Sequence, residues 1–210
     1  MPSEPLNCDE RWSGADTPRR NAAMNENDKV NTGLKELIAS AGEGAGARPV
    51  ETWNPPYCGD IGMAIKSDGT WTFGGSPIGR FALVKLFASI LRKDADGRTY
   101  LVTPVEKVDC HVADAPFMAV EMAVSNTGRA QTLTFRTNVD DIVTADRDHP
   151  MRFSVQAPAG GLKPYVLVRG RLEALLTRAL YADLVELAVE HEGRPGVWSG
   201  GIFWPFEEQV

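Results

Sequence analysis

The sequence predicts an α+β protein whose ordered part contains two diverged copies of one strand-turn-strand-helix-strand unit around a mainly antiparallel sheet. Short runs that alternate apolar and polar residues predict strands, and apolar residues three and four positions apart predict helices. The copies cover about residues 60–103 and 150–204, with a β-rich middle at residues 104–149. Both copies follow the order hairpin, Gly-Arg, helix, Gly-Arg, strand, and this shared order indicates an internal duplication.

The composition is that of an ordinary globular protein. Of the 210 residues, 43% are hydrophobic and 24% are charged, which is enough apolar surface for a real core. The formal net charge of −6 argues against a nucleic-acid partner, because such binding relies on clustered Lys and Arg. No apolar run is long enough to span a bilayer and no signal-peptide pattern is present, so we expect a cytoplasmic protein without a membrane partner.

The N-terminal residues 1–52 differ from the rest of the chain. They are rich in Asn, Asp, Glu, Gly and Ala, so we expect a mostly disordered tail. Its one periodic group of Leu and Ile residues predicts a short helix over residues 33–41, and Met24 is an alternative start of the native protein. The α+β body is expected to comprise residues 53–210.

The first unit begins with a hairpin. Residues 62–73 contain two alternating runs around an Asp-Gly turn, which Gly favours because it accepts positive φ. Ser76 and Pro77 then carry the signature of an N-cap followed by a proline at the first helical position. An amphipathic helix is predicted over residues 77–93, and a strand at residues 100–102.

The middle and the second unit repeat these signals. Alternation in the middle is typical of an antiparallel sheet with one face in water. Apolar positions from Leu172 to Leu187 predict a second helix, which is either longer than the first or broken near Tyr181. The remaining predicted strands lie at residues 105–112, 117–124, 131–137, 142–143, 151–155, 164–168 and 200–204.

The loop before the first strand is one candidate site. Cys58 and Asp60 place a thiol and a carboxylate two residues apart, after a rigid Pro-Pro pair. The structural interpretation is favoured, in which the aromatic residues cover the core and Asp60 satisfies backbone N–H groups of the turn. A hydrolase or transferase that uses Cys58 as nucleophile, with Asp60 or His149 as base, remains the alternative.

The glycine-rich entry to the first helix is a second candidate. Exposed N–H groups at a helix start attract anions, and Arg80 adds a cation beside Ser76. The segment lacks the residues of a P-loop or of a dinucleotide fingerprint. A capped helix whose Arg80 pairs with a surface acid is an equally good interpretation.

A third group of polar residues accompanies the later strands. Arg136, Asn138, His149 and Arg152 suit an acidic or polar small ligand, although charged outward faces of strands have the same composition. A His before a Pro is more often a turn residue than a general base. We therefore predict no catalytic residue in this group.

The three cysteines, Cys8, Cys58 and Cys110, form no C-x-x-C pair and suit a reducing compartment. Cys110 and His111 are adjacent and should point to opposite faces of a strand. Neither a metal site nor a cofactor is therefore predicted.

Several motifs appear in a fixed order, among them Asn54-Pro-Pro-Tyr-Cys-Gly-Asp-Ile61, Leu133-Thr-Phe-Arg-Thr-Asn138 and Gly196-Val-Trp-Ser-Gly-Gly201. In these motifs the chain resembles the proteobacterial domain of unknown function number 1285, from Trp53 to the C-terminus. The resemblance implies an α+β body with repeated motifs, some likeness to pleckstrin-homology domains, and a role in sensing or signalling. It brings no assigned activity, cofactor or catalytic residue.

Because the polar groups are dispersed and none forms a complete catalytic set, the sequence favours a binding protein over an enzyme. The leading hypothesis is a ligand-binding or regulatory module for an anionic small molecule or a phosphorylated partner. A protein-interaction platform at a sheet edge is a further alternative. The sequence makes no prediction of the oligomeric state.

Overall fold

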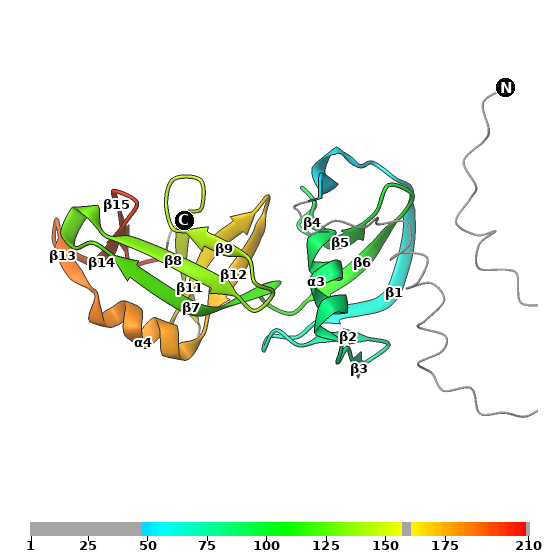
Figure 1. The fold of residues 1–210 in the computed structure, drawn as a ribbon, viewed down its shortest axis with the longest axis horizontal. Helices are drawn as coiled ribbons and strands as arrows, with labels where there is room; N and C mark the ends of the chain where they lie inside the picture. The colour runs from blue at the N-terminus through cyan, green and yellow to red at the C-terminus, as the bar shows by residue number, and fades with distance from the viewer. Residues whose placement is uncertain (1–47, 157–160, 209–210) are drawn as a thin grey trace, which may run out of the picture.

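The structure is a computed structural model that describes residues 48–156 and 161–208. They form two lobes that lie side by side along the long axis of the molecule (Figure 1). The predicted helix at residues 33–41 and the alternative start at Met24 lie outside the described residues. Within the described ranges, no helix has the length and apolar character needed to cross a membrane.

The first lobe is built on a six-stranded sheet, sheet A, with the strand order β3-β2-β1-β6-β5-β4. Two antiparallel three-stranded meanders meet along one parallel pair, β1 with β6. A helix, α3, connects the two meanders, and a short 3-10 helix, η1, precedes the sheet. The elements are η1 (Val50–Thr52), β1 (Tyr57–Ile65), β2 (Trp71–Phe73), β3 (Ser76–Pro77), α3 (Phe81–Ser89), β4 (Leu91–Lys93), β5 (Thr99–Val102) and β6 (Lys107–Val112).

The second lobe repeats this arrangement in sheet B, whose strand order is β9-β8-β7-β12-β11-β10. Again two antiparallel meanders meet along one parallel pair, here β7 with β12. The connection from β9 to β10 is a loop, and the helix of this lobe, α4, follows the last strand. The elements are β7 (Phe117–Ser125), η2 (Gly128–Ala130), β8 (Thr132–Thr137), β9 (Ile142–Thr144), β10 (Met151–Gln156), β11 (Gly161–Arg169), β12 (Leu172–Leu176) and α4 (Arg178–Glu186).

A small antiparallel sheet, sheet C, packs at the far end of the second lobe (Figure 1). It contains β13 (Val189–His191), β14 (Arg194–Ser199) and β15 (Ile202–Pro205). The buried Ser199 fastens it to sheet B, because its hydroxyl accepts the Leu133 N–H at 2.9 Å and donates to the Ala145 carbonyl at 2.6 Å.

The α+β fold class and the internal duplication are thereby confirmed. The two similar units span residues 57–112 and 117–176, whereas the sequence signals placed them at about 60–103 and 150–204. The difference arises because the helix connects the meanders in the first unit and follows them in the second. Because the predicted units were matched through their helices, strands from different positions in the two sheets were treated as equivalent.

The first helix is shorter than predicted, with α3 inside the expected range of 77–93. Ser76 does not cap it, because Ser76 and Pro77 pair with β2 as an edge strand, where a proline loses no ladder hydrogen bond. Arg80 occupies the N-cap position without a side-chain hydrogen bond. At the other end, the apolar residues after Ser89 continue into β4.

The predicted helix from Leu172 to Leu187 is also corrected. Residues Leu172, Ala174 and Leu176 are buried while Glu173 and Leu175 between them are partly exposed, which is the period of two of a strand. Helix α4 then starts after Thr177, whose hydroxyl accepts the Leu180 N–H at 3.4 Å. A run rich in leucine satisfied the helical spacing although its first part is a strand.

Polar contacts tie the two lobes together. The Arg169 guanidinium, at the end of β11, donates to the Ala88 carbonyl at 2.7 Å and pairs with Asp141. The last carbonyls of a helix lack partners within the helix and attract cations, so Arg169 satisfies the C-terminal end of α3. Lys85 on α3 adds an ion pair of 3.0 Å with Asp140. The C-terminal half of α3 is thus held against the second lobe.

Replacement of Arg169 by Met should therefore lower the free energy of unfolding by about 1–3 kcal/mol, because the Ala88 carbonyl loses its donor. The measurement is a urea unfolding curve followed by circular dichroism. Arg147→Met is the matched control, since Arg147 is exposed in the β9–β10 loop. Equal losses of stability in the two variants would contradict the role assigned to Arg169.

Candidate functional site

The Cys58–Asp60 loop forms an irregular start of β1. The register of β1 against β6 shifts on both sides of Asp60, which indicates a bulge. Asp60 accepts the Gly62 N–H at 2.7 Å and lies 2.9 Å from His111 Nε2. The hydrogen bond with His111, followed by that with Gly62, holds the pKa of Asp60 below its usual value. Cys58 is partly buried and packs against the core, whereas the Asp60 side chain is about half exposed.

The face of sheet A beside Asp60 carries a polar network that the sequence analysis did not identify. The buried Asp109 carboxylate accepts the Tyr57 hydroxyl at 2.5 Å and Arg98 at 2.5 Å. The Tyr100 hydroxyl donates to Asp96 at 2.7 Å, and this bond raises the pKa of Tyr100 to about 12. These groups satisfy one another, so the network stabilises the sheet. The alternation of polar residues from Lys107 to His111 is the sequence signal that predicts this polar face.

The start of α3 offers few groups that could bind a ligand. Ser76 lies exposed on the two-residue edge strand β3, and Arg80 is exposed at the N-cap of α3. Among the described residues, no other charged or polar side chain is hydrogen-bonded to either of them. The predicted anion site is therefore an open surface around one cation.

Arg136 and Asn138 are engaged in structural contacts. Arg136 pairs with Glu121 across the β7–β8 ladder and with Asp140 at 2.8 Å. Asn138 accepts the Met118 N–H at 3.0 Å and so holds the end of β8 to β7. Arg136 also lines a pocket of about 530 Å³ on this sheet, whose other lining groups are mostly apolar.

His149 and Arg152 are placed around the start of β10. The Asp146 carboxylate accepts the His149 N–H at 3.0 Å, and the His149 ring nitrogen Nδ1 lies 3.4 Å from the same oxygen. Arg152 binds both oxygens of Glu173, at 3.0 and 2.7 Å, and stacks 4.2 Å from the centre of the Tyr165 ring. These are contacts of a turn and of a cross-strand ion pair.

The predicted site residues thus fall on both lobes and do not line one pocket. Cys58, Asp60, Ser76 and Arg80 belong to the first lobe, whereas Arg136, Asn138, His149 and Arg152 belong to the second. The described residues also contain no group of three or more His, Cys, Asp or Glu side chains placed to hold a metal ion.

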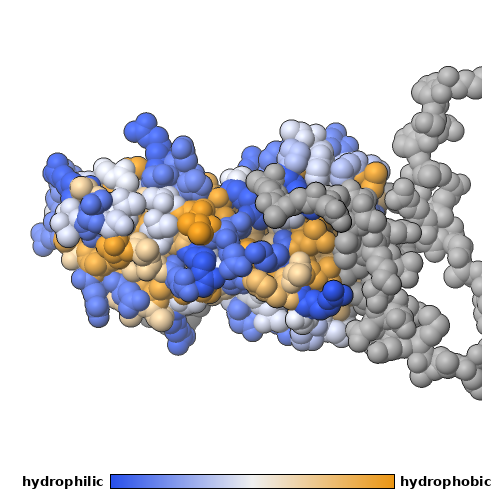
Figure 2. Space-filling view, viewed as in Figure 1, coloured by the Kyte–Doolittle hydropathy of each residue, from blue (hydrophilic) through white to orange (hydrophobic). Residues whose placement is uncertain are grey.

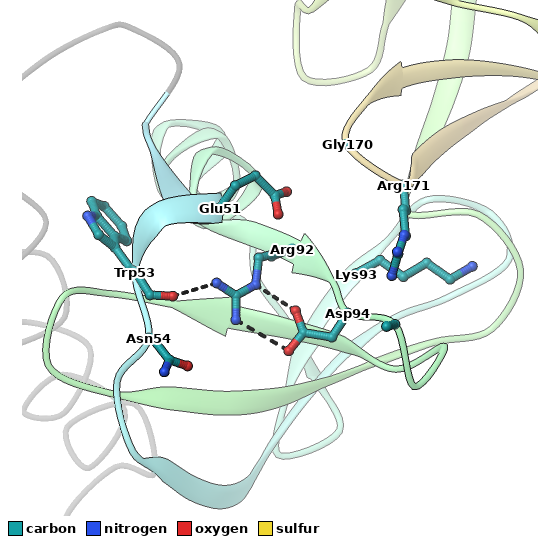
Figure 3. Close-up of a pocket in the computed structure, with 9 residues that line it drawn as sticks. Glu51, Trp53, Asn54, Arg92, Lys93, Asp94, Gly170 and Arg171 are labelled. Carbon is teal, nitrogen blue, oxygen red and sulfur yellow. Dashed lines mark hydrogen bonds and ion pairs between the residues drawn. The ribbon is translucent and has the colours of Figure 1, made fainter.

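A cleft of about 480 Å³ lies elsewhere, between the two lobes (Figure 3). On the first lobe it is lined by η1, the residues that follow η1, and the end of β4. On the second lobe it is lined by the turn between β11 and β12. Its charged and polar side chains are Glu51, Asn54, Arg92, Lys93, Asp94 and Arg171.

Arg92 forms the floor of this interlobe cleft and is fully engaged. Its guanidinium donates to the Val50 carbonyl at 2.7 Å. It also donates to the Trp53 carbonyl at 2.7 Å and to Asp94 at 2.6 Å (Figure 3). Asp94 also pairs with Lys107 at 3.1 Å, and these partners keep its pKa low despite partial burial. Arg92 and Asp94 are therefore structural groups that tie η1 to sheet A.

Lys93 and Arg171 complete the interlobe cleft from the two lobes. Neither cation has an acidic partner within 4.0 Å among the residues the structure describes, although Glu51 lines the same cleft. Neither residue was predicted as a site residue, since Arg171 counted only as part of the Gly-Arg pair of the second unit and only the packing of the lobes brings the two cations to one cleft. The interlobe cleft is the place where unsatisfied charged groups from separate parts of the chain meet.

Residues 48–115 match the N-terminal domain, and residues 116–206 the C-terminal domain, of a protein family of unknown function, DUF1285. The chain belongs to the DUF1285 family. The boundary between the two DUF1285 domains falls between sheets A and B, so each lobe corresponds to one domain. The resemblance inferred from the sequence motifs is thereby confirmed. Among the curated proteins, none matches this chain.

Crystal structures of two DUF1285 family proteins are similar to this chain. The protein from Silicibacter pomeroyi DSS-3 is 46% identical, with a TM-score of 0.77 over 82% of this chain and 94% of that chain. The protein from Shewanella baltica OS155 is 28% identical, with a TM-score of 0.48 over 60% of this chain and 91% of that chain. The first comparison supports the fold described above, and neither description assigns a ligand or a reaction.

Replacement of His111 by Ala should raise the pKa of Asp60 toward its ordinary value, because the hydrogen bond that is the leading cause of its depression is removed. A depressed carboxyl pKa stabilises the fold above the ordinary pKa, and that stabilisation is lost as the pH falls through the lowered value. Both side chains are about half exposed or more, so the loss at neutral pH should stay below about 1 kcal/mol.

Carbon-13 NMR titration of the carboxyl groups measures this change. Asp68 is the internal control, because the Thr70 N–H lowers its pKa without any contribution from His111. An Asp60 titration that is the same in the variant and the wild type would refute the pairing.

Proposed function

We propose that this protein is a binding module that holds an anionic small molecule in the interlobe cleft, through Lys93 and Arg171. The observation that carries the proposal is that these two cations line one cleft from opposite lobes without an acidic partner among the described residues. An anion in the cleft would be attracted by both cations, whereas the Asp94 carboxylate is already paired with Arg92 and Lys107.

The two cations are chemically complementary. The Arg171 guanidinium is suited to two parallel hydrogen bonds with a carboxylate or phosphate, and the Lys93 ammonium acts as a compact point charge. The volume of about 480 Å³ is that of a site for a small molecule. Since the contacts come from both lobes, an anion would also stabilise their relative position, which suits a regulatory or sensing role.

The helix start at Ser76 and Arg80 is the weaker place for such an anion. There one exposed cation stands at a helix N-terminus, and no second lobe or strand contributes a group. We therefore assign the anionic ligand predicted from the sequence to Lys93 and Arg171 instead of Arg80.

An enzyme that uses Cys58 is less well supported. His149 lies in the other lobe beside Asp146, and Asp60 is hydrogen-bonded to His111. A nucleophile needs its base within hydrogen-bond reach, and this arrangement places neither predicted base in that role. The geometry favours binding over catalysis.

A platform at a sheet edge is also less well supported. The edge strands β3, β4 and β9 contain only two or three residues, and Glu208 already pairs with Phe153 on the edge strand β10. On the face drawn in Figure 2, apolar side chains occur in small groups between polar ones, as on an ordinary water-exposed surface. Strand addition needs a longer open ladder.

The proposal is tested by titration with inorganic phosphate, pyrophosphate and citrate, followed by thermal shift and calorimetry. A bound anion raises the melting temperature, and at one concentration a tighter anion raises it more. Lys93→Gln and Arg171→Gln should each weaken binding by about tenfold, because each removes one charged hydrogen bond. Arg80→Gln is the matched control and should leave binding unchanged.

Two outcomes would contradict the proposal. One is the absence of any stabilisation by the three anions. The other is a loss of binding in Arg80→Gln equal to that in Lys93→Gln, which would return the anion to the helix start.

A further inference from the structure

We infer that the ligand of the interlobe cleft carries hydrogen-bond donors beside its anionic group, and that Glu51 binds these donors. This inference rests on the proposed function and specifies the class of ligand. It starts from the one carboxylate in the cleft that the fold leaves unpaired. Among the residues that the structure describes, Glu51 forms no ion pair within 4.0 Å, although Arg92, Lys93 and Arg171 line the same cleft.

The position of Glu51 is set by the turn opposite it. A Cβ atom at Gly170 would lie 2.8 Å from Glu51 Oε1, so the carboxylate rests directly on the glycine backbone of the second lobe. Gly170 also has φ of +52°, a conformation that side chains rarely adopt. The missing side chain at position 170 therefore lets a carboxylate of the first lobe approach the β11–β12 turn.

A carboxylate at this place opposes a purely anionic ligand. Two negative groups in one cleft repel each other. A carboxylate that accepts a hydroxyl or ammonium group of the same ligand instead contributes a charge-assisted hydrogen bond. Glu51 thus discriminates against simple anions and in favour of ligands with donors.

Asn54 offers further hydrogen bonds to a ligand with polar groups. Its amide offers two donors and one acceptor, and it makes no hydrogen bond within the described residues. The unsatisfied groups of the cleft are then two cations, one carboxylate and one amide. Their complement is a small molecule with an anionic group at one end and hydroxyl or ammonium groups at the other. A phosphorylated polyol and an α-amino acid share this chemistry.

The experiment compares three probes in calorimetric titrations of the whole chain: inorganic phosphate, glycerol 3-phosphate and L-serine. Inorganic phosphate lacks the carbon-bound hydroxyl or ammonium groups, glycerol 3-phosphate adds hydroxyl groups, and L-serine adds an ammonium group to a carboxylate. Each probe is titrated into the wild type, Glu51→Gln and Lys93→Gln. Glu190→Gln, an exposed residue on β13, is the matched control for loss of one negative charge.

The expected result is that Glu51→Gln lowers the affinity for the donor-bearing probes but not for phosphate. Glu51→Gln should weaken the binding of glycerol 3-phosphate or L-serine about tenfold, because a charged acceptor becomes a neutral one. The same variant should leave phosphate binding unchanged or strengthen it. If the variant weakens only glycerol 3-phosphate, Glu51 binds hydroxyl donors, and if it weakens only L-serine, Glu51 binds an ammonium donor. Glu190→Gln should change none of the affinities.

The failures of the two proposals are distinguishable. If Lys93→Gln weakens binding but Glu51→Gln strengthens every probe alike, the anion site stands and the role of Glu51 is overturned. If phosphate binds and neither donor-bearing probe does, the inferred ligand class is overturned. If no probe binds the wild type, both proposals fall.

Discussion

Each lobe depends on one parallel strand pair, β1 with β6 and β7 with β12. These pairs join the first and last strands of a unit, so the two meanders form one sheet and the remaining strands become its edges. The chain must then travel from one edge, β3 or β9, to the opposite edge, β4 or β10. Parallel pairing requires such a crossing connection, whereas antiparallel neighbours need only a tight turn.

The two lobes meet this requirement differently. In the first lobe α3 makes the crossing and buries Phe87 against Trp71 in the core, with the ring centres 6.4 Å apart. In the second lobe a loop makes the crossing, and α4 instead leads the chain to sheet C. The C-terminal end of α3 is consequently free to accept Arg169 from the second lobe. The asymmetry between the copies thus creates the contact that joins them and positions the interlobe cleft.

Local features of the fold could be predicted from the sequence. The hairpin of β1 and β2 follows from alternation and an Asp-Gly turn, and Gly69 has the positive φ of 82° that this turn requires. The ends of α3 were not readable, because Ser76 and Pro77 carry a capping signature but pair with β2 instead. Tertiary pairing overrides a local preference of about 1 kcal/mol.

The candidate site was less predictable, because its groups are brought together by register and by lobe packing. Asp60 and His111 are 51 positions apart, and their contact follows only from the parallel pairing of β1 with β6. Lys93 ends an edge strand and Arg171 sits in a hairpin turn, positions where single cations are common and carry no signal. Only the polar motifs stood out, and they proved to hold strands and turns in place.

The location of the interlobe cleft has a further physical consequence. Its walls belong to two lobes that are tied by a few polar contacts, chiefly those of Arg169 and Lys85. A ligand that contacts both walls favours the arrangement that it binds, and by linkage any contact that fixes that arrangement tightens the ligand. The ties between α3 and the second lobe are therefore coupled to the cleft even though they do not line it. Under the proposed function, the joint between the lobes is the part through which ligand binding would reach the rest of the molecule.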